Sequence, residues 1–304
     1  MIFITTNFLV SFNYLNHLYI YHIMKYVIML FVGCNSGIGK VTALELAKQS
    51  AKIIMGCRNL ETAKVAQEDI KSQSGNDNVI LKKLDLSSFA SVREFAAEVN
   101  QEEEKIDLLI NNAGIMSVGF GLTEDGYEKQ FAVNHLGHFL LTHLLLDLVK
   151  KAESARIVVL ASRVASRGST DFEDVNYEKS TYGPNSSYSR SKRANVLFAN
   201  ELSRRLEGTQ VTAYSLHPGI VKTELFRNLP GVARFFLTPA RAFMKTVEQG
   251  AKTTLYCALK EGIEEHSGQY FAGSKLASFP HDKELAGKLW DLSERLVGIK
   301  EQSE

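Results

Sequence analysis

The chain is short of cysteine, of net charge and of metal-like motifs, and each shortage excludes a class of protein. It has 304 residues, three cysteines and a formal net charge of +1. Cys34, Cys57 and Cys257 follow no metal-like spacing, and so sparse and odd a set argues against a disulfide scaffold and for a reducing compartment. We expect all three to be buried packing residues. No long basic or acidic block points to nucleic acid as a partner.

Linkers and repeats are lacking as well. No internal repeat and no segment rich in glycine, serine and proline divides the chain. The hydrophobic content of 45% is ample for one large α/β domain or two small ones. We interpret 26–304 as a single domain, with a looser segment around 226–243.

Residues 1–25 form an apolar leader that differs from the rest of the chain, with Lys25 as its only formal charge. Asn7, Asn13 and Asn16 interrupt the leader, so it lacks a clean run of the roughly 20 apolar residues that a membrane-spanning helix needs. It also lacks the early basic residue and the small-residue cleavage site of a secretory signal. A weak membrane anchor, an interfacial segment and an artefact of where the coding region was taken to start all remain open.

From residue 26 onward, short apolar runs alternate with segments of helical periodicity. The runs are rich in β-branched residues and show no polar alternation, which indicates strands buried on both faces under helices. Repeated strand–helix units predict an α/β fold, a single-domain Rossmann-like doubly wound parallel sheet of about seven strands flanked by helices. The predicted strands are 26–32, 52–57, 79–84, 106–110, 156–161, 211–216 and 269–271. The predicted helices are 38–49, 61–72, 89–103, 125–150, 188–206, 246–260 and 284–296.

A glycine-rich loop lies between the first predicted strand and the first predicted helix. Glycines there permit a tight turn and the close approach of a pyrophosphate to the N-terminus of the helix. A tight turn without a ligand is the alternative, but the position between strand and helix favours a nucleotide site. The predicted cofactor contacts in this loop are Gly33, Asn35, Ser36, Gly37, Ile38 and Gly39.

The end of the second predicted strand indicates which dinucleotide is bound. Chains that bind NAD(H) carry an Asp or Glu there for the ribose 2′-hydroxyl, whereas this strand ends Cys57-Arg58-Asn59, with no acid. Arg58 can bind a 2′-phosphate in a bidentate way, and Lys40 could add charge. We therefore expect NADP(H), against the alternative that Arg58 is an ordinary surface residue.

Tyr188 and Lys192 lie four residues apart in a predicted helix, which places the phenol and the ammonium on one face, one turn apart. A nearby cation favours the phenolate and lowers the tyrosine pKa from about 10. The pair is a candidate acid/base device. Taken alone it is also typical of a solvated lysine beside a half-buried tyrosine, so its meaning depends on the glycine loop.

Together and in order, the motifs resemble the short-chain dehydrogenase/reductase family, and within it the retinol dehydrogenase group. The resemblance covers residues 26 to 225. The family's marks are Gly33-x-x-x-Gly37-x-Gly39, Asn111-Asn112-Ala113-Gly114, Asn134, Ser162, Tyr188-x-x-x-Lys192 and His217-Pro218-Gly219. The marks of the group are Gly37-Ile38-Gly39-Lys40, Cys57-Arg58-Asn59, and the stretches 133–139 and 267–271.

The resemblance implies a role for each catalytic residue. Tyr188 would be the general acid/base that protonates a carbonyl oxygen as hydride arrives, and Lys192 would lower its pKa and hold the nicotinamide ribose. Ser162 would hydrogen-bond the substrate oxygen. Asn134 would fix a water that connects Lys192 to solvent. The alternatives are structural, with Ser162 as a turn cap and Asn134 as a buried polar group of a helix.

Further positions suit the cofactor. Asp85, at the end of the third predicted strand, can accept from the adenine amine, although Asp85 followed by Ser87 is also typical of a helix cap. A hydroxyl at Thr223 can bond the carboxamide. The remaining predicted contacts are Asn111, Ala113, Tyr188, Lys192, Pro218 and Gly219.

Two departures from the family pattern stand out. The family usually has Thr before the first loop glycine, where this chain has Val32, which loses a hydroxyl hydrogen bond worth of order 1 kcal/mol. Tyr188 follows Ser162 by 26 positions, more than in the small soluble members and similar to the retinol dehydrogenase group.

The resemblance implies an NADP(H)-dependent enzyme acting on CH–OH groups, which interconverts a lipophilic alcohol and its aldehyde or ketone. The apolar stretches 118–122 and 225–243 either wall a pocket for a retinal-like substrate or pack on the core. The alternatives are a steroid or other carbonyl reductase of the same family, or a non-catalytic cofactor-binding regulatory protein. We expect an intracellular, cytosol-facing protein, held at the endoplasmic reticulum or another membrane if residues 1–25 are an anchor. Homo-oligomer formation is left open.

Overall fold

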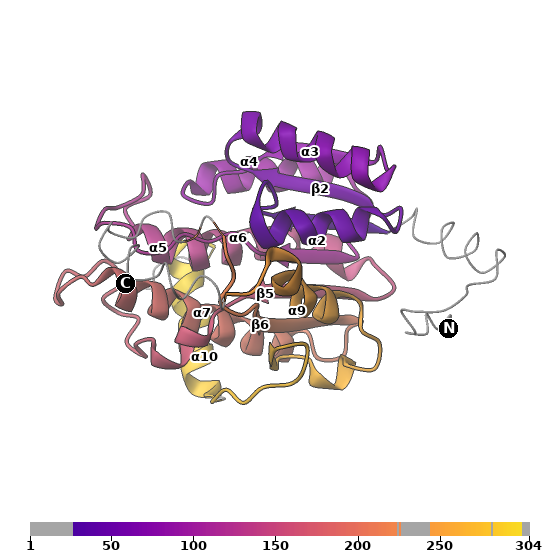
Figure 1. Ribbon diagram of the computed structural model, residues 1–304. Coiled ribbons are helices and arrows are strands. Elements are labelled where there is room, and N and C mark those ends of the chain that lie inside the picture. The colour runs from indigo at the N-terminus through magenta and orange to yellow at the C-terminus, as the bar shows by residue number, and fades with distance from the viewer. Residues whose placement is uncertain (1–26, 224, 226–243, 281, 300–304) are drawn as a thin grey trace.

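The computed structural model describes residues 27–223, 225, 244–280 and 282–299, so the predicted leader at 1–25 lies outside the described residues. A parallel sheet of seven strands has the order β3-β2-β1-β4-β5-β6-β7 (Figure 1). The strand order reverses between β1 and β4, which makes their carboxyl ends the place where such sheets bind ligands. The strands are β1 (Ile28–Val32), β2 (Lys52–Cys57), β3 (Val79–Lys83), β4 (Leu108–Asn111), β5 (Ala155–Leu160), β6 (Val211–His217) and β7 (Tyr270–Ala272).

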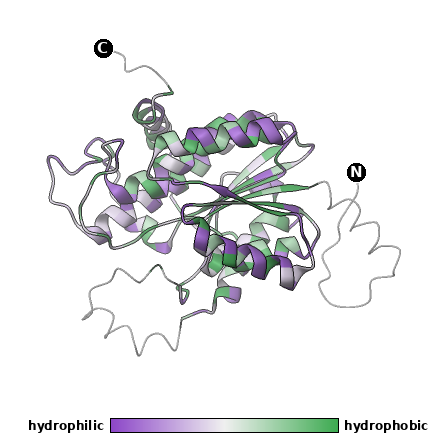
Figure 2. Ribbon diagram, turned by 90° about the horizontal axis from the view of Figure 1, so that it is seen from above, coloured by the Kyte–Doolittle hydropathy of each residue, from purple (hydrophilic) through white to green (hydrophobic). Residues whose placement is uncertain are grey.

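Helices cover both faces of the sheet, and this confirms the predicted doubly wound fold. Alternate residues of β1 enter opposite cores: Leu30 packs against one layer of helices and Phe31 against the other. Figure 2 shows the largely hydrophobic strands lying between helices that mix polar and apolar residues. One layer holds α4 (Phe89–Glu102), α6 (Gly137–Lys150), α7 (Pro184–Arg205) and α10 (Lys283–Leu296), and the other α2 (Gly37–Ala47), α3 (Leu60–Ser74) and α9 (Val247–Leu259).

The predicted helix 125–150 is wrong at its start. Asp125 lies in a turn, where its Oδ2 accepts from the Phe89 backbone N–H at 2.9 Å. The helical path begins only at α5 (Lys129–Phe131) and passes through a π-helical turn, η1 (Ala132–Leu136), before α6. Apolar periodicity runs through all of these segments, so it hides both the turn and the change of helix type.

Lys129–Lys150 is the one helical stretch among the described residues that is long and apolar enough to cross a membrane, with a mean hydropathy of 1.2 over its most apolar window. Of that window, 78% is buried inside the fold. Its apolar surface is therefore already covered by protein, as in the core helix of a folded domain.

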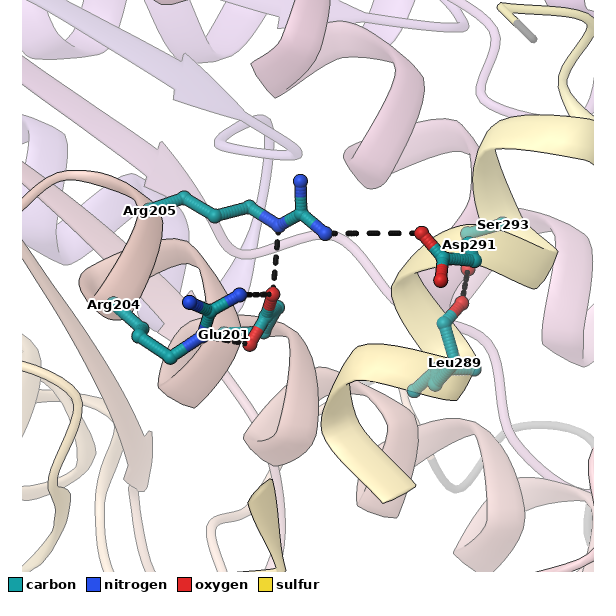
Figure 3. Close-up of polar contacts among 6 residues, drawn as sticks. All are labelled: Glu201, Arg204, Arg205, Leu289, Asp291 and Ser293. Atoms are coloured by element: carbon teal, nitrogen blue, oxygen red, sulfur yellow. Dashed lines mark hydrogen bonds and ion pairs between the residues drawn. The ribbon is translucent and has the colours of Figure 1, made fainter. Parts of the chain in front are cut away.

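Helix α7 is fixed to α10 near its C-terminal end, as Figure 3 shows. Glu201 is buried and accepts from Arg204 Nε at 2.8 Å and from Arg205 Nε at 2.7 Å. The Arg205 guanidinium also lies over the Trp290 ring, 4.4 Å from its centroid, and reaches Asp291 at 3.7 Å. Because the Glu201 carboxylate is paired with two guanidinium groups, its burial is compensated.

Candidate active site

The glycine loop leaves β1 in a backbone conformation that requires glycine. Gly33 has a φ of 77°, and a Cβ there would lie 2.7 Å from the Cβ of Ala113. Gly39 sits so close to the Gly33 carbonyl that a Cβ would overlap it. Asn112 donates from Nδ2 to the Gly33 oxygen at 2.5 Å, which ties the loop to the end of β4. This tie supports the loop where Val32, which is fully buried, offers no hydroxyl.

The loop opens a helix whose first turn is free to bind an anion. Ser36 is the N-cap of α2, and its side chain makes no capping hydrogen bond. Backbone N–H groups at the start of a helix lack intrahelical partners and carry a partial positive charge. Gly37, with a φ of 57°, lets the chain turn tightly into this helix. The residues present therefore fit the pyrophosphate of a dinucleotide, which would rest on the first turn of α2.

A cleft of 580 Å³ runs along the carboxyl ends of the strands from the glycine loop to α7. A volume of this size suits a small-molecule site. The predicted site residues that line it are Gly33, Asn35, Ser36, Gly37, Ile38, Gly39, Arg58, Asp85, Ala113, Tyr188, Lys192, Pro218 and Thr223. Lining residues that sequence reasoning did not single out for the cofactor include Gly56, Leu86, Asn112, Gly114, Ile115 and Val133.

Asn111 is not brought to the cleft. It is fully buried as the last residue of β4, and its Nδ2 donates to Thr142 Oγ1 on α6 at 2.8 Å. Asn112 is the residue that lines the cleft instead. Successive side chains along a strand point to opposite sides, and the twin Asn111-Asn112 gives no sign of which one faces the cleft. Gly219 is also outside the lining, and a Cβ there would meet the Lys245 side chain at 2.7 Å.

Tyr188 and Lys192 lie on α7, as predicted, with their side chains at the cleft. Lys192 Nζ is 5.9 Å from the centroid of the Tyr188 ring. It donates to the Leu160 carbonyl at the end of β5 at 2.9 Å, and a Cβ on Gly114 would lie 3.4 Å from it. Gly114 therefore leaves room for the lysine to reach the cleft between the ends of β4 and β5.

Burial controls the protonation of this pair. Burial raises the pKa of Tyr188 to about 12, although a hydrogen bond with Ser162 acts in the opposite direction. Burial also lowers the pKa of Lys192 to about 8. The predicted lowering of the tyrosine pKa by the cation is thus wrong, because desolvation of the phenolate outweighs the charge of an ammonium whose Nζ is 5.9 Å from the ring centroid. Tyr188 is a phenol at neutral pH, suited to giving a proton.

Ser162 caps a turn, which is the structural role that sequence reasoning left open for it. It is the N-cap of a 3-10 turn (Arg163–Arg167), where its Oγ accepts from the Val164 N–H at 3.5 Å. It also hydrogen-bonds Tyr188. The hydroxyl groups of Ser162 and Tyr188 are therefore neighbours, although Ser162 itself is not among the residues that line the cleft.

Asn134 sits in the π-helical turn η1, a distortion often found at functional sites. Its Nδ2 donates to the Ile115 carbonyl at 3.0 Å and to Ser191 Oγ at 2.9 Å, and its Oδ1 accepts from the Ile115 N–H at 2.8 Å. Its own carbonyl accepts from His138 Nδ1 at 3.0 Å. Both amide hydrogens are used within the protein, so any water on this side chain would have to bind its oxygen.

The far end of the cleft carries exposed cations. Arg58 lines the cleft, and its carbonyl accepts from Lys83 Nζ at 2.7 Å, which brings a second cation to its backbone. Lys40 was expected to add positive charge for the 2′-phosphate, but it pairs with Asp69 at 2.6 Å and is not among the residues that line the cleft. Asp85 lines the cleft, while its Oδ1 accepts from the N–H and the hydroxyl of Ser87 at 2.9 and 2.6 Å.

The long segment between Ser162 and Tyr188 is held in place by buried side chains from elsewhere. Arg190 donates to the carbonyls of Asp174 and Val175, each at 2.6 Å. Glu128 is fully buried and accepts from Ser187 Oγ at 2.7 Å, one residue before the tyrosine. Gln130 donates to Tyr182 Oη at 2.9 Å. These contacts fix the start of α7 and so the position of Tyr188.

Of the two predicted pocket walls, residues 118–122 are not among those that line the cleft. In 118–122, the Val118 carbonyl accepts from Tyr182 Oη at 2.8 Å, and Phe120 stacks edge-on against the Tyr182 ring with centroids 5.3 Å apart. Phe120 is 55% exposed, so it offers apolar surface without packing on the core. Of the second wall, 225–243, only Leu225 is among the described residues, and it lines the cleft.

Comparison with known sequences identifies relatives of this arrangement. The sequence model of the family described as short chain dehydrogenase matches residues 27–231. The chain is 47% identical to retinol dehydrogenase 14 of Mus musculus over 287 residues, covering 89% of this chain and 86% of that protein. It is 44% identical to retinol dehydrogenase 13 of Homo sapiens over 283 residues, covering 90% and 86%.

Solved structures give the same result. An uncharacterized protein from Mycobacterium Paratuberculosis has 33% sequence identity and a TM-score of 0.71, and the match covers 90% of this chain and 93% of that one. The fold is therefore shared over nearly the whole length of both chains.

Proposed function

The chain belongs to the short-chain dehydrogenase family, and on that basis we propose that it is an NADP(H)-dependent oxidoreductase that interconverts a lipophilic alcohol and its aldehyde or ketone, with a retinal-like compound as substrate. Proteins of this family use a nicotinamide dinucleotide as cofactor. The observation that carries the proposal is that Tyr188, hydrogen-bonded to Ser162, and Lys192 line the same cleft as the glycine loop and Arg58.

The proposed chemistry is proton transfer timed with hydride transfer. The bound nicotinamide supplies or takes the hydride. In reduction, Tyr188 gives its proton to the carbonyl oxygen, and in oxidation it takes the proton of the alcohol. Because burial raises the pKa of Tyr188 to about 12, the phenol is protonated in the neutral range and has a proton to give when a carbonyl is reduced. Ser162 donates a hydrogen bond to the same substrate oxygen as negative charge develops on it.

Lys192 and Asn134 support the tyrosine in this proposal. Burial lowers the pKa of Lys192 to about 8, so the side chain is mostly charged at pH 7 and can hold the hydroxyls of a ribose. When Tyr188 loses its proton, the ammonium on the next turn of the helix stabilises the phenolate. Asn134 keeps the loop at Ile115 in place and can hold a water on its Oδ1 for resupply of protons.

NADP(H) rather than NAD(H) is proposed because of the charge at the end of β2. Arg58 is exposed and lines the cleft, and no acid stands at Cys57-Arg58-Asn59 to bind a free 2′-hydroxyl. Asn59 is occupied as the N-cap of α3, where its side chain accepts from the Thr62 N–H. A guanidinium free to form two parallel hydrogen bonds matches a phosphate.

The lipophilic substrate is proposed from the walls around the reacting centre. Ile115, Met116 and Leu225 line the cleft, and the stretch that follows Met116 carries exposed Phe120 and Leu122. Apolar walls with a few polar groups at the centre suit a long apolar carbonyl compound. The names of the relatives, retinol dehydrogenases 13 and 14, favour a retinoid among such compounds.

The test is oxidation of NADPH and of NADH by the purified full-length chain with a panel of retinoid, steroid and aliphatic carbonyls. We expect turnover with NADPH and retinal-like aldehydes, and at least tenfold weaker turnover with NADH. A steroid or aliphatic preference would overturn the substrate proposal alone. Absence of turnover with every carbonyl, in protein that binds NADPH, would favour a non-catalytic cofactor-binding protein instead.

A further inference from the structure

Two of the three cysteines lie side by side beneath the glycine loop. Cys57 is the last residue of β2, and Cys34 follows the last residue of the neighbouring β1 by two positions. Val32 and Gly56 are paired in the sheet, and the Gly33 N–H donates to the Gly56 carbonyl at 3.0 Å. Both cysteines are buried, and Cys57 also lines the cleft. Each thiol therefore has the other as a neighbour, at the floor of the cofactor site.

The two thiols differ in pKa. The Cys34 thiol has one hydrogen, which it can donate to the Phe31 carbonyl at 3.8 Å or to the sulfur of Cys57. The Cys57 sulfur also accepts from the backbone N–H groups of Cys34 and Asn35. The hydrogen bond from Cys34 lowers the pKa of Cys57, whereas burial raises the pKa of Cys34. Cys57 is thus the more readily ionised and more nucleophilic of the pair.

Cys257 provides the contrast within the same chain. It lies on α9, fully buried, and burial raises its pKa to about 12. It does not line the cleft. A thiol that keeps its proton and is remote from the cleft is chemically inert.

We propose that Cys34 and Cys57 form a redox modification site, in which a hydroperoxide that enters the cleft before the cofactor oxidises Cys57, and Cys34 then closes a disulfide that prevents cofactor binding. The first step forms an S–O bond: the Cys57 thiolate attacks the peroxide, the O–O bond breaks, and the leaving oxygen takes a proton to become water or an alcohol. In the second step the Cys34 sulfur attacks the sulfenic sulfur, and its hydroxyl leaves as water. Two thiols are oxidised by two electrons, and one peroxide is reduced.

The disulfide would alter the loop that receives the pyrophosphate. In the reduced protein the Cys57 sulfur accepts from the N–H groups of Cys34 and Asn35, which holds the loop against the end of β2. Forming the bond draws Cys34 toward β2 and takes away this acceptor. Asn35 and Ser36 line the cleft, so their displacement would remove part of the surface that binds the cofactor. This consequence rests on the proposed function, whereas formation of the disulfide does not.

The experiment treats the full-length chain with hydrogen peroxide, with and without saturating NADP+, and maps its cysteines by mass spectrometry. We expect loss of two hydrogen masses, a peptide that links Cys34 to Cys57, and reversal by dithiothreitol. Cys257→Ser should behave like the native chain. In Cys34→Ser, dimedone should trap a sulfenic acid on Cys57, and Cys57→Ser should give no product at Cys34. NADP+ should slow the reaction by roughly tenfold or more.

Cofactor affinity, measured by calorimetry before and after oxidation, separates the two proposals. The native chain should bind NADP+ before treatment and lose roughly tenfold or more in affinity after it, while Cys34→Ser treated identically should not acquire the linked peptide. The modification proposal is overturned if peroxide yields no peptide linking Cys34 to Cys57, or if oxidation at Cys257 is faster than at Cys57. Failure of the untreated protein to bind NADP+ would instead overturn the proposed function, since the linked peptide is read out without any cofactor.

Discussion

The proposed cofactor side of the cleft, from the glycine loop to Arg58, and the proposed substrate side, around Tyr188, are held in different ways. The cofactor side is made by backbone: paired strand ends, the glycine loop and the first turn of α2 place their groups with few side chains involved. The substrate side is made by side chains. Glu128, Gln130 and Arg190 reach across to fix a long irregular segment and the start of α7.

The two halves of the cleft position their groups by different physical means. Strand register positions backbone groups whatever their side chains are. Glycine is required only where a Cβ atom would not fit. On the substrate side, the position of Tyr188 depends on buried polar groups that must all be satisfied. Substitutions in the first half should therefore destabilise the protein through backbone strain, and substitutions in the second half through unpaired polar groups.

The largest effect should come from adding a methyl group to the cofactor side. In Gly33→Ala, a residue with φ of 77° gains a Cβ that lies 2.7 Å from the Ala113 Cβ. We expect a loss of about 2–5 kcal/mol in the free energy of unfolding from the left-handed backbone and the overlap together. Gly75→Ala is the matched control, since Gly75 has φ of 68° and open space around it, and should lose only about 1–2 kcal/mol. Urea unfolding measures both, and equal losses would contradict the close approach.

A smaller but selective effect should follow from reversing the charge at the cofactor side. Arg58→Glu should weaken NADP+ binding by about 1.5–3 kcal/mol, roughly ten- to a hundredfold in Kd, and should spare NAD+. Lys40→Gln is the control, because Lys40 pairs with Asp69 outside the cleft lining. Titration calorimetry with both dinucleotides checks this. If Arg58→Glu changed neither Kd, the assignment of the 2′-phosphate site would be wrong.

On the substrate side, Glu128→Gln should impair catalysis without touching the cofactor. Glu128 accepts from the Gln130 and Phe131 N–H groups at 2.9 Å and from Ser187 Oγ at 2.7 Å. An amide retains one acceptor oxygen and sets an NH₂ group against these donors, which costs about 1–3 kcal/mol of stability. We expect a lower kcat with an unchanged Kd for NADPH. Exposed Glu178→Gln in the same segment should change neither, and weaker NADPH binding in Glu128→Gln would show that the two halves are not separately held.

The smallest expected effect is a pH dependence of NADP+ affinity that is caused by Lys192, which lies between the two halves of the cleft. With its pKa lowered to about 8 by burial, Lys192 is charged below that pH and neutral above it. NADP+ affinity should therefore fall as pH rises from 7 to 9, by about fivefold, the equivalent of about 1 kcal/mol for one lost charge. Lys192→Met should remove this pH dependence, and the Leu160 carbonyl would keep Asn195 Nδ2 at 3.0 Å as a donor. An identical pH profile in native and variant proteins would exclude the lysine from cofactor binding.

The cofactor side was far more predictable from sequence than the substrate side, for a physical reason. Gly33, Gly37 and Arg58 are brought to the cleft by local backbone geometry or by position at a strand end, and both leave a pattern in neighbouring residues. The contacts of Glu128 and Arg190 join residues far apart in the chain, and no local pattern marks them. The same holds for Asn111, whose direction is set by the sheet, and for the pKa of Tyr188, which is set by burial.

Tyr188 is proposed to give the proton in a hydride-transfer site, and the decisive measurement is a single-turnover comparison of Tyr188→Phe with the native chain. Tyr214→Phe is the matched control, because burial raises the pKa of Tyr214 as well, while its hydroxyl donates to the Ile263 carbonyl at 3.2 Å, away from the residues that line the cleft. We predict that Tyr188→Phe slows reduction of the carbonyl by about 10²–10⁴-fold with NADPH affinity unchanged, and that Tyr214→Phe leaves the chemical step largely intact. Turnover by Tyr188→Phe at a rate close to that of the native chain would show that Tyr188 is not the proton donor.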